Sequence, residues 1–212
     1  VHATLSDLHD EYCLTLIPKM KYSTFPVTAY EQNCSIAWCE QTLKAAFIDP
    51  GGDIDRLVLE TIELGVEPVA VYLTHGHLDH VGGAQALARH YAIPVIGPHP
   101  DDKYWLDALD QQAEMFSFPE CSPFEPDRWL DEGDQLVFGQ QKLDVLHAPG
   151  HTPGHVVLLH RADGVLFSGD VLFRGSIGRS DFPGGNHQHL INSIKSKLFT
   201  LDDAVVVVPG HG

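Results

Sequence analysis

The sequence predicts an α/β protein in which two β-sheets lie between outer helices. Apolar, β-branched runs come early in the chain, alternate with helical patterns in the middle and return towards the end. The 212 residues, of which 43% are hydrophobic, are enough for one domain with a buried core. Periodicity alone also fits other α/β arrangements, so the layer order stays open at this point.

The first half of the chain is predicted to supply one sheet and two helices. Residues 21–30 and 33–40 alternate between apolar and polar, as paired strands do, and a third strand over 43–48 ends in the turn Asp49-Pro50-Gly51-Gly52. A helix is predicted from Asp53, a suitable N-cap, to residue 64, and Gly65 is expected to end it. The other elements predicted in this half are a buried strand at 69–73, a helix at 81–91 and a short strand at 94–97.

The second half is predicted to begin irregularly and then to form hairpins. Between residues 98 and 128 only short helical turns are indicated, around 104–106 and 115–116. The elements predicted beyond that region are a hairpin of 135–138 with 142–146 around Gly139, a hairpin of 156–160 with 165–168, a helix over 190–199 and a buried strand at 204–208.

The segment from Thr74 to His80 reads T-H-G-H-L-D-H and holds His75, His77, Asp79 and His80. Neutral imidazole and carboxylate are the ligands that borderline divalent metals take. The segment connects a predicted strand to a predicted helix, at the strand end where open α/β sheets place their sites. Asp79 could also act as the N-cap of that helix, which is compatible with ligation because a carboxylate has two oxygens.

Three further polar residues follow predicted strands. His151 lies in a loop rich in glycine and proline, where His155 is expected to orient the loop by hydrogen bonding and His147 to be a bystander. Asp170 could simply form a turn. However, a two-metal site also needs a carboxylate that bridges the two cations, which imidazoles do not provide, and Asp170 could be this ligand. His211 follows the last predicted strand and is flanked by two glycines.

Together these side chains suffice for two four- or five-coordinate ions that share Asp170 and a water molecule. One ion is expected to be held by His75, His77 and His151, and the other by Asp79, His80 and His211. Cations lower the pKa of nearby water towards ~7, which makes hydroxide available at neutral pH. We expect two divalent ions, with zinc as the first choice and iron or manganese as alternatives.

Charge and composition exclude several other classes of function. The formal net charge of −16 argues against nucleic acid and against anionic membrane surfaces as partners. No apolar run approaches the ~18 residues of a membrane span, and no targeting signal is visible. Four cysteines without a C-x-x-C pair favour a reducing compartment, so a cytoplasmic location is expected.

The order H-x-H-x-D-H at 75–80, then His151, Asp170 and His211, resembles the metallo-β-lactamase-fold hydrolases. The resemblance implies an αββα sandwich over residues 21–212, with the metals at one edge and the ligand division given above. Residues 1–20 are then expected to be an N-terminal extension or leader. True β-lactamases have a cysteine where this chain has Asp170, so antibiotic hydrolysis is disfavoured.

Within that superfamily, the motifs D-P-G-G at 49–52, G-H-T-P-G-H at 150–155 and P-G-H-G at 209–212 resemble glyoxalase II and its short bacterial relatives. The implied activity is hydrolysis of a small-molecule glutathione thioester, S-D-lactoylglutathione, to glutathione and D-lactate by a metal-bridging hydroxide. Asp79 is the expected catalytic residue, because it would position this hydroxide and take its proton. The leaving thiolate has a pKa near ~8.5 and needs little help from an acid.

An alternative activity comes from residues 178–182, which also resemble a segment of persulfide dioxygenases. Those enzymes hold one iron with two histidines and a carboxylate, which His75, His151 and Asp170 could supply. Arg179 would then anchor a glutathione carboxylate, or it would instead form an ion pair with Asp181. Another hydrolase of the same fold, such as a lactonase, is a third alternative.

Overall fold

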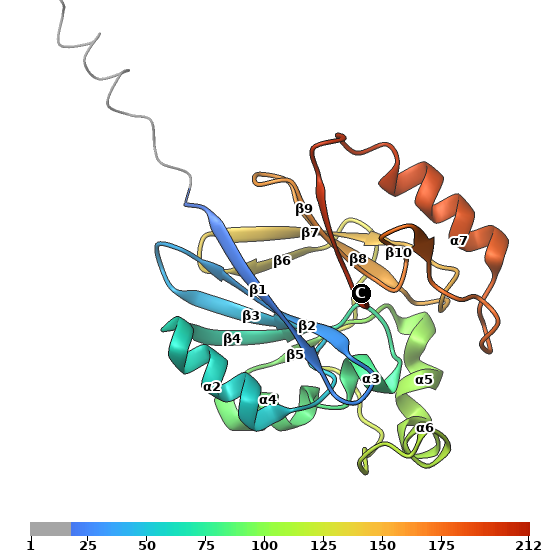
Figure 1. Cartoon of the computed structure of the whole chain (residues 1–212), viewed down its shortest axis with the longest axis horizontal. Helices are drawn as coiled ribbons and strands as arrows, with labels where there is room; N and C mark the ends of the chain where they lie inside the picture. The colour runs from blue at the N-terminus through green and yellow to red at the C-terminus, as the bar shows by residue number, and fades with distance from the viewer. Residues whose placement is uncertain (1–17) are drawn as a thin grey trace, which may run out of the picture.

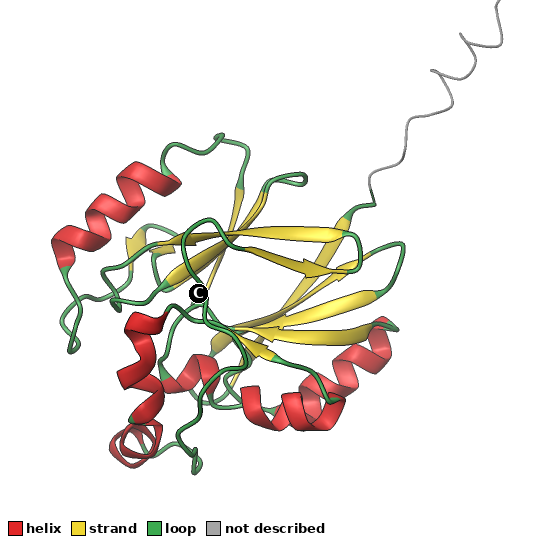
Figure 2. Cartoon of the chain, turned by 180° about the vertical axis from the view of Figure 1, so that it is seen from behind, coloured by secondary structure: helices red, strands yellow, loops and turns green. Residues whose placement is uncertain are grey.

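The computed structural model describes residues 18–212, so most of the predicted extension at 1–20 lies outside the described part of the chain. The described residues form a four-layer αββα sandwich, in which two sheets face each other and helices cover their outer faces (Figure 1; Figure 2). The predicted fold class is therefore confirmed. No helix between residues 18 and 212 is long and apolar enough to cross a membrane.

The first sheet has the strand order β1-β2-β3-β4-β5. Its first three strands pair antiparallel, whereas β3, β4 and β5 run parallel to one another. The strands are β1 (Met20–Val27), β2 (Gln32–Cys39), β3 (Lys44–Ile48), β4 (Glu67–Tyr72) and β5 (Val95–Ile96). All five were predicted, and their ends differ from the predicted ones by a few residues.

The second sheet has the order β12-β9-β8-β7-β6, and only the β12–β9 pair is parallel. Its strands are β6 (Gln135–Phe138), β7 (Gln141–His147), β8 (Val156–His160), β9 (Val165–Gly169) and β12 (Val206–Pro209). A separate pair, β10 (Leu172–Phe173) with β11 (Ser176–Ile177), was not predicted. Two-residue strands carry too little sequence pattern to be recognised.

Helices cover the outer faces of both sheets (Figure 1). The first sheet is covered by α2 and α4, and the second by α7. The helical elements are α2 (Ile54–Leu64), α3 (Leu78–Val81), α4 (Ala84–Tyr91), η1 (Pro100–Asp102), α5 (Lys103–Asp107), α6 (Leu109–Phe116), α7 (His187–Ser193) and η2 (Ile194–Leu198).

The structure corrects two predicted helix starts. Asp53 precedes α2 in a left-handed conformation and does not cap the helix; its carboxylate instead accepts the Thr28 N–H at 2.9 Å. Asp79 is not an N-cap either, because α3 begins at Leu78, after His77. Gly65 does end α2, also in a left-handed conformation, as predicted.

The helix predicted at 81–91 is divided into α3 and α4 at Gly82 and Gly83. The glycines allow this part of the chain to lie against the turn that follows β3. A Cβ atom on Gly82 would lie 2.7 Å from the Gly51 carbonyl oxygen, and one on Gly83 would lie 2.6 Å from that of Pro50. Two glycines in succession also weaken a helix, which favours the break at this point.

Hydrophobic side chains fill the space between each pair of layers. The central layer includes Tyr72 from the first sheet and Phe138 and Phe167 from the second, all almost fully buried. Two further clusters lie between the first sheet and α2, α4 and α6, and between the second sheet and α7.

Hydrogen bonds join the two sheets at one edge of the sandwich. Val156 N–H donates to the Thr74 carbonyl at 2.8 Å, and Asn33 N–H in β2 donates to the Gly210 carbonyl at 2.7 Å. The loops that follow β4, β7, β9 and β12 consequently meet at this edge.

Candidate metal centre

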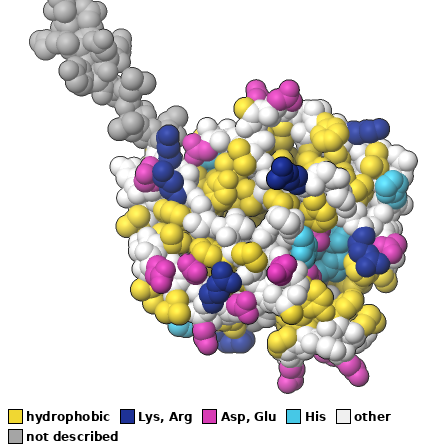
Figure 3. Space-filling view, in the orientation of Figure 1, with side chains coloured by type: hydrophobic (Ala, Val, Ile, Leu, Met, Phe, Trp, Pro, Cys, Tyr) yellow, Lys and Arg dark blue, Asp and Glu magenta, His cyan; other side chains and the backbone are white. Residues whose placement is uncertain are grey.

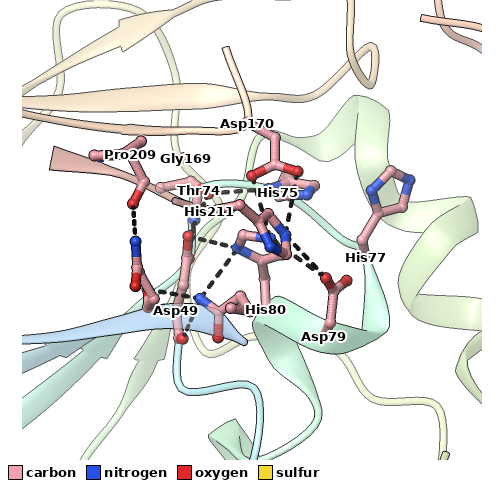
Figure 4. Close-up of polar contacts among 12 residues, drawn as sticks. Asp49, Thr74, His75, His77, Asp79, His80, Gly169, Asp170, Pro209 and His211 are labelled. Atoms are coloured by element: carbon pink, nitrogen blue, oxygen red, sulfur yellow. Dashed lines mark hydrogen bonds and ion pairs between the residues drawn. The ribbon is translucent and has the colours of Figure 1, made fainter. Parts of the chain in front are cut away.

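The seven predicted ligands come together at the edge where the two sheets are joined. Figure 4 labels six of them, all except His151. The segment from His75 to His80 follows β4, His151 follows β7, Asp170 follows β9, and His211 follows β12. Residues far apart in the sequence therefore present imidazole and carboxylate groups to one small volume.

One group of donors consists of His75, His77 and His151, whose nearest ligand atoms all lie within 4.8 Å of one another. The Nδ1 atom of His77 is 2.9 Å from Nε2 of His151. This spacing is compatible with two nitrogens bound at ~2.1 Å to the same ion. Burial lowers the pKa of all three histidines, so they are neutral near pH 7 and able to act as ligands.

The second group consists of Asp79, His80 and His211, again with ligand atoms within 4.8 Å of one another. His211 Nε2 lies 3.2 Å from Asp79 Oδ2, and His80 Nε2 lies 3.8 Å from the same oxygen.

Asp170 lies between the two groups. Its Oδ1 atom is 3.4 Å from His80 Nε2, and its Oδ2 atom is 3.6 Å from His151 Nε2 and 3.7 Å from His211 Nε2. One carboxylate thus reaches both donor groups, which is the arrangement expected of a shared ligand.

Hydrogen bonds hold the histidine rings with Nε2 directed into the cluster. His151 donates Nδ1–H to the Arg179 carbonyl at 2.7 Å, and His80 Nδ1 lies 3.0 Å from Asp49 Oδ2. His75 Nδ1 lies 3.0 Å from the Thr74 hydroxyl, which itself donates to Asp49. Such partners fix the ring tautomer and leave Nε2 free to bind a metal.

Several buried donor atoms in this cluster have no hydrogen-bond partner among residues 18–212. They include Nε2 of His75, Nε2 of His80 and Oδ1 of Asp170. Buried polar atoms are normally paired, so their concentration here points to an ion as the missing partner.

The charge of the cluster fits a cation as well. Burial lowers the pKa of His80, but the carboxylates of Asp170, Asp79 and Asp49 outweigh burial and raise this pKa to about 9. An excess of negative charge therefore surrounds His80, and divalent metal ions would balance it. The residues present fit a metal centre in donor type, spacing and charge.

Two buried aspartates that support the cluster were not identified from the sequence. The first is Asp49, which accepts hydrogen bonds from the Thr74 N–H at 2.7 Å and the Thr74 hydroxyl at 2.6 Å, besides contacting His80. Its D-P-G-G context indicates only a turn. The sequence does not indicate its hydrogen-bond partners, Thr74 and His80, because they lie 25 and 31 residues further along the chain.

The second is Asp102, which is completely buried. It accepts the Gly76 N–H at 2.9 Å, the Gly154 N–H at 2.6 Å and the Thr152 hydroxyl at 2.7 Å. Burial raises the pKa of the Asp102 carboxyl to about 6, although the three hydrogen bonds lower it. This pKa is still below 7, so the ionised form predominates at neutral pH. Asp102 ties the His75–His80 loop to the His151 loop, and no sequence pattern indicated this.

The two other histidines of the 147–155 loop play supporting parts. The Nε2 atom of His155 accepts the Asp170 N–H at 3.0 Å, which agrees with the predicted orienting role. His147 Nε2 donates instead to the Pro153 carbonyl at 2.8 Å, and its ring stacks on His99.

Arg179 forms the ion pair that was one of its two predicted roles. Its guanidinium donates two hydrogen bonds to Asp181, both at 2.7 Å, and lies 4.1 Å from the centre of the Phe182 ring. The side chain borders a cleft of about 760 Å³ that opens beside the metal cluster between α5–α6 and the β10–β11 segment.

Comparison with known proteins agrees with this geometry. The model of the metallo-beta-lactamase superfamily matches residues 28–211. The hydroxyacylglutathione hydrolase GloC of Haemophilus influenzae is 44% identical over 194 residues, which are 91% of each chain.

Two solved structures are also similar. The B3 metallo-beta-lactamase BLEG-1 has a TM-score of 0.83 at 34% identity, with 91% of this chain and 92% of that chain covered. The di-iron-bound form of TTHA1623 has a TM-score of 0.81 at 35% identity, with 90% and 92% covered.

Proposed function

The chain belongs to the metallo-beta-lactamase superfamily, and we propose that it is a binuclear metallohydrolase that cleaves glutathione thioesters such as S-D-lactoylglutathione. The observation that carries this proposal is the set of seven donors, divided into two groups that Asp170 links. The 44% identity to a hydroxyacylglutathione hydrolase supports the choice of substrate class.

In this proposal His75, His77 and His151 hold one ion, Asp79, His80 and His211 hold the other, and Asp170 binds both. Bound divalent ions would polarise the acyl carbonyl and lower the pKa of water enough to provide hydroxide at neutral pH. We propose zinc, with iron or manganese as alternatives, because the donor set suits all three.

Asp79 is proposed to act as the catalytic carboxylate. Burial tends to raise its pKa, but His80 and the hydrogen bond from His211 outweigh burial and lower the pKa well below its usual value. The carboxylate is therefore ionised and able to orient attacking water. The departing thiolate, with a pKa near ~8.5, leaves without a dedicated acid.

The test is a thiol-release assay on the purified protein together with elemental analysis of the same sample. We expect free glutathione to appear from S-D-lactoylglutathione, about two metal ions per chain, and loss of activity after chelation that added metal restores. Absence of thiol release from metal-loaded protein would contradict the proposal.

The alternative, a mononuclear iron persulfide dioxygenase, would use His75, His151 and Asp170. It leaves Asp79, His80 and His211 without a role, although their donor atoms lie together. Oxygen uptake with glutathione persulfide, accompanied by one iron per chain, would favour the dioxygenase over the hydrolase. Hydrolysis of a lactone, without release of thiol from any glutathione thioester, would favour the third alternative, a lactonase.

Substitution of Asp79 by asparagine is expected to lower kcat for thiol release about a hundredfold, since a neutral amide orients attacking water less strongly than a carboxylate does. Asp79 also lines the cleft and is a proposed ligand, so the metal content and KM of the variant are measured beside kcat. Unchanged thiol release in this variant would remove Asp79 from the mechanism. Glu63→Gln, an acidic residue on α2 away from the cluster, is the matched control.

A further inference from the structure

The cleft beside the metal cluster has walls that are almost entirely hydrocarbon. From these walls we infer, on the basis of the proposed thioester hydrolysis, that the preferred substrate carries a large apolar acyl group. The lactoyl group has only three carbons and one hydroxyl, and glutathione is polar and charged, so lactoylglutathione would leave most of the apolar surface of a cleft of about 760 Å³ without an apolar partner.

One wall comes from α5 and α6 and the residues around them. It is formed by Tyr30, Leu78, Trp105, Met115, Phe116 and Phe118. Trp105 also contacts the metal cluster directly, with its ring centre 4.4 Å from that of His77. An acyl group bound along this wall would therefore extend away from the site of hydrolysis.

The opposite wall comes from the β10–β11 pair and the loop that follows it. Phe173, Ile177, Phe182 and Pro183 contribute to this wall. Phe182 packs edge-on to His77 at 5.0 Å between ring centres, and Phe173 packs against His211 at 6.3 Å. Figure 3 shows hydrophobic side chains around the exposed histidine surface.

Polar groups on the walls are largely occupied by the protein itself. Tyr30 donates its hydroxyl to the Phe116 carbonyl at 2.7 Å, and Tyr104 donates its hydroxyl to Pro183. Gln112 accepts from the Leu78 N–H at 3.0 Å and donates to the Trp105 carbonyl at 2.7 Å. Trp105 Nε1–H, which has no partner among residues 18–212, and the Gln111 side chain are the uncharged polar groups left to recognise a polar acyl group.

Charged groups are equally scarce. Outside the metal cluster, Arg179 is the one charged side chain among the described residues that line the cleft. Its guanidinium is already paired with Asp181. Burial of hydrocarbon is therefore the main source of acyl-group selectivity that this cleft offers.

A series of glutathione thioesters tests the inference, with D-lactoyl, acetyl, butyryl, hexanoyl and benzoyl groups. Each rate is divided by the rate of uncatalysed alkaline hydrolysis of the same thioester, which removes differences in intrinsic reactivity. Because one buried methylene contributes roughly a threefold gain in kcat/KM, we expect the hexanoyl thioester, which has four more methylenes, to exceed the acetyl one by about 80-fold. The hexanoyl and benzoyl thioesters should both exceed the lactoyl one.

Failure of this inference differs from failure of the proposed function. If lactoylglutathione is cleaved as well as or better than hexanoylglutathione, the inference is wrong while thioester hydrolysis stands. If no thioester in the series is cleaved by metal-loaded protein, the proposed function itself is wrong.

Binding of thioethers provides a second readout that does not depend on turnover. S-hexylglutathione has no bond that hydrolysis could cleave, and titration calorimetry compares its affinity with that of S-methylglutathione. We expect the hexyl compound to bind at least about tenfold more tightly. Equal affinities would contradict an apolar acyl site.

Two double variants, one in the cleft and one outside it, test whether the preference for apolar acyl groups arises in the cleft. Met115 is 75% exposed at the rim, and Ile177 lies in the opposite wall. The double variant Met115→Gln/Ile177→Thr replaces hydrocarbon with polar atoms at both positions and removes one heavy atom at residue 177, so the hexanoyl-to-lactoyl ratio of kcat/KM should fall about tenfold.

The matched control is Ile62→Gln/Val137→Thr, at positions 68% and 54% exposed that do not line the cleft. This variant should leave the hexanoyl-to-lactoyl ratio unchanged. An equal fall in both double variants would show that the ratio reports general surface polarity, and the inference would then be wrong.

Discussion

Asp170→Asn is expected to lower kcat/KM for thioester hydrolysis by roughly three orders of magnitude, the loss typical of removing a group that supports both metal ions. Metal content should fall from about two ions per chain to one or fewer. The carboxylate oxygens of Asp170 lie 3.4 to 3.7 Å from Nε2 of His80, His151 and His211. An amide provides one neutral oxygen in place of the two anionic ones, so it serves neither ion well.

The same substitution should change the stability of the metal-free protein little. Without ions, Asp170 is repelled by Asp49 and Asp79 but attracted by His80, whose pKa these carboxylates raise, so its removal loses two opposing contributions. The backbone N–H of Asp170, which His155 accepts, is retained in asparagine. Thermal unfolding in the presence of a chelator measures this directly.

Asp163→Asn is a suitable control because Asp163 also lies beside a histidine, His160, at 3.5 Å, but in the β8–β9 turn, at the end of β9 opposite to Asp170. It should change kcat/KM less than about twofold, as surface substitutions usually do. If Asp170→Asn retained full metal content and activity within a few fold of the unmodified protein, a shared-ligand role for Asp170 would be untenable.

The layers of the fold were predictable because each element carries a local pattern. Buried strands such as β4 and β9 are continuous apolar runs, and α2 keeps an amphipathic period. The break between α3 and α4 was missed, although Gly82 and Gly83 are visible in the sequence, since the cause is contact with the turn after β3. Likewise, the left-handed conformation of Asp53 depends on a distant partner, Thr28.

The candidate metal centre was likewise predictable only where its residues carry a local sequence pattern. The seven donors could be proposed from the sequence because imidazole and carboxylate groups recur directly after strands, and strand ends meet at a sheet edge. Asp49 and Asp102 could not be proposed from the sequence. An aspartate that accepts hydrogen bonds from distant backbone groups has no local sequence pattern that identifies it. The apolar walls of the cleft were equally hidden, because their residues come from elements with little periodicity.

Asp102→Ala is expected to reduce the free energy of unfolding by about 3 kcal/mol or more. The substitution leaves the buried N–H groups of Gly76 and Gly154 and the Thr152 hydroxyl without their acceptor. Each buried donor left unpaired costs about 1–3 kcal/mol, and rearrangement of the hydroxyl would recover part of the loss. Urea unfolding of the metal-free protein gives this value.

Metal affinity is the measurement that separates a positioning role for Asp102 from a purely structural one. Gly76 lies between His75 and His77, and Thr152 follows His151, so Asp102 sets the distance between the two loops that present these imidazoles. Loss of such support typically costs 10- to 100-fold in metal affinity. Competition with a chromophoric chelator, on protein that is still folded, should show a loss of about that size.

Two further variants help to distinguish a positioning role of Asp102 from a purely structural one. Asp102→Asn keeps one acceptor oxygen, so its stability and metal affinity should lie between those of Asp102→Ala and the unmodified protein. Asp101→Ala removes the same functional group at the neighbouring exposed position, and should change stability by no more than about 0.5 kcal/mol. If Asp102→Ala were destabilised but bound metal as tightly as the unmodified protein, Asp102 would stabilise the fold without positioning the ligands.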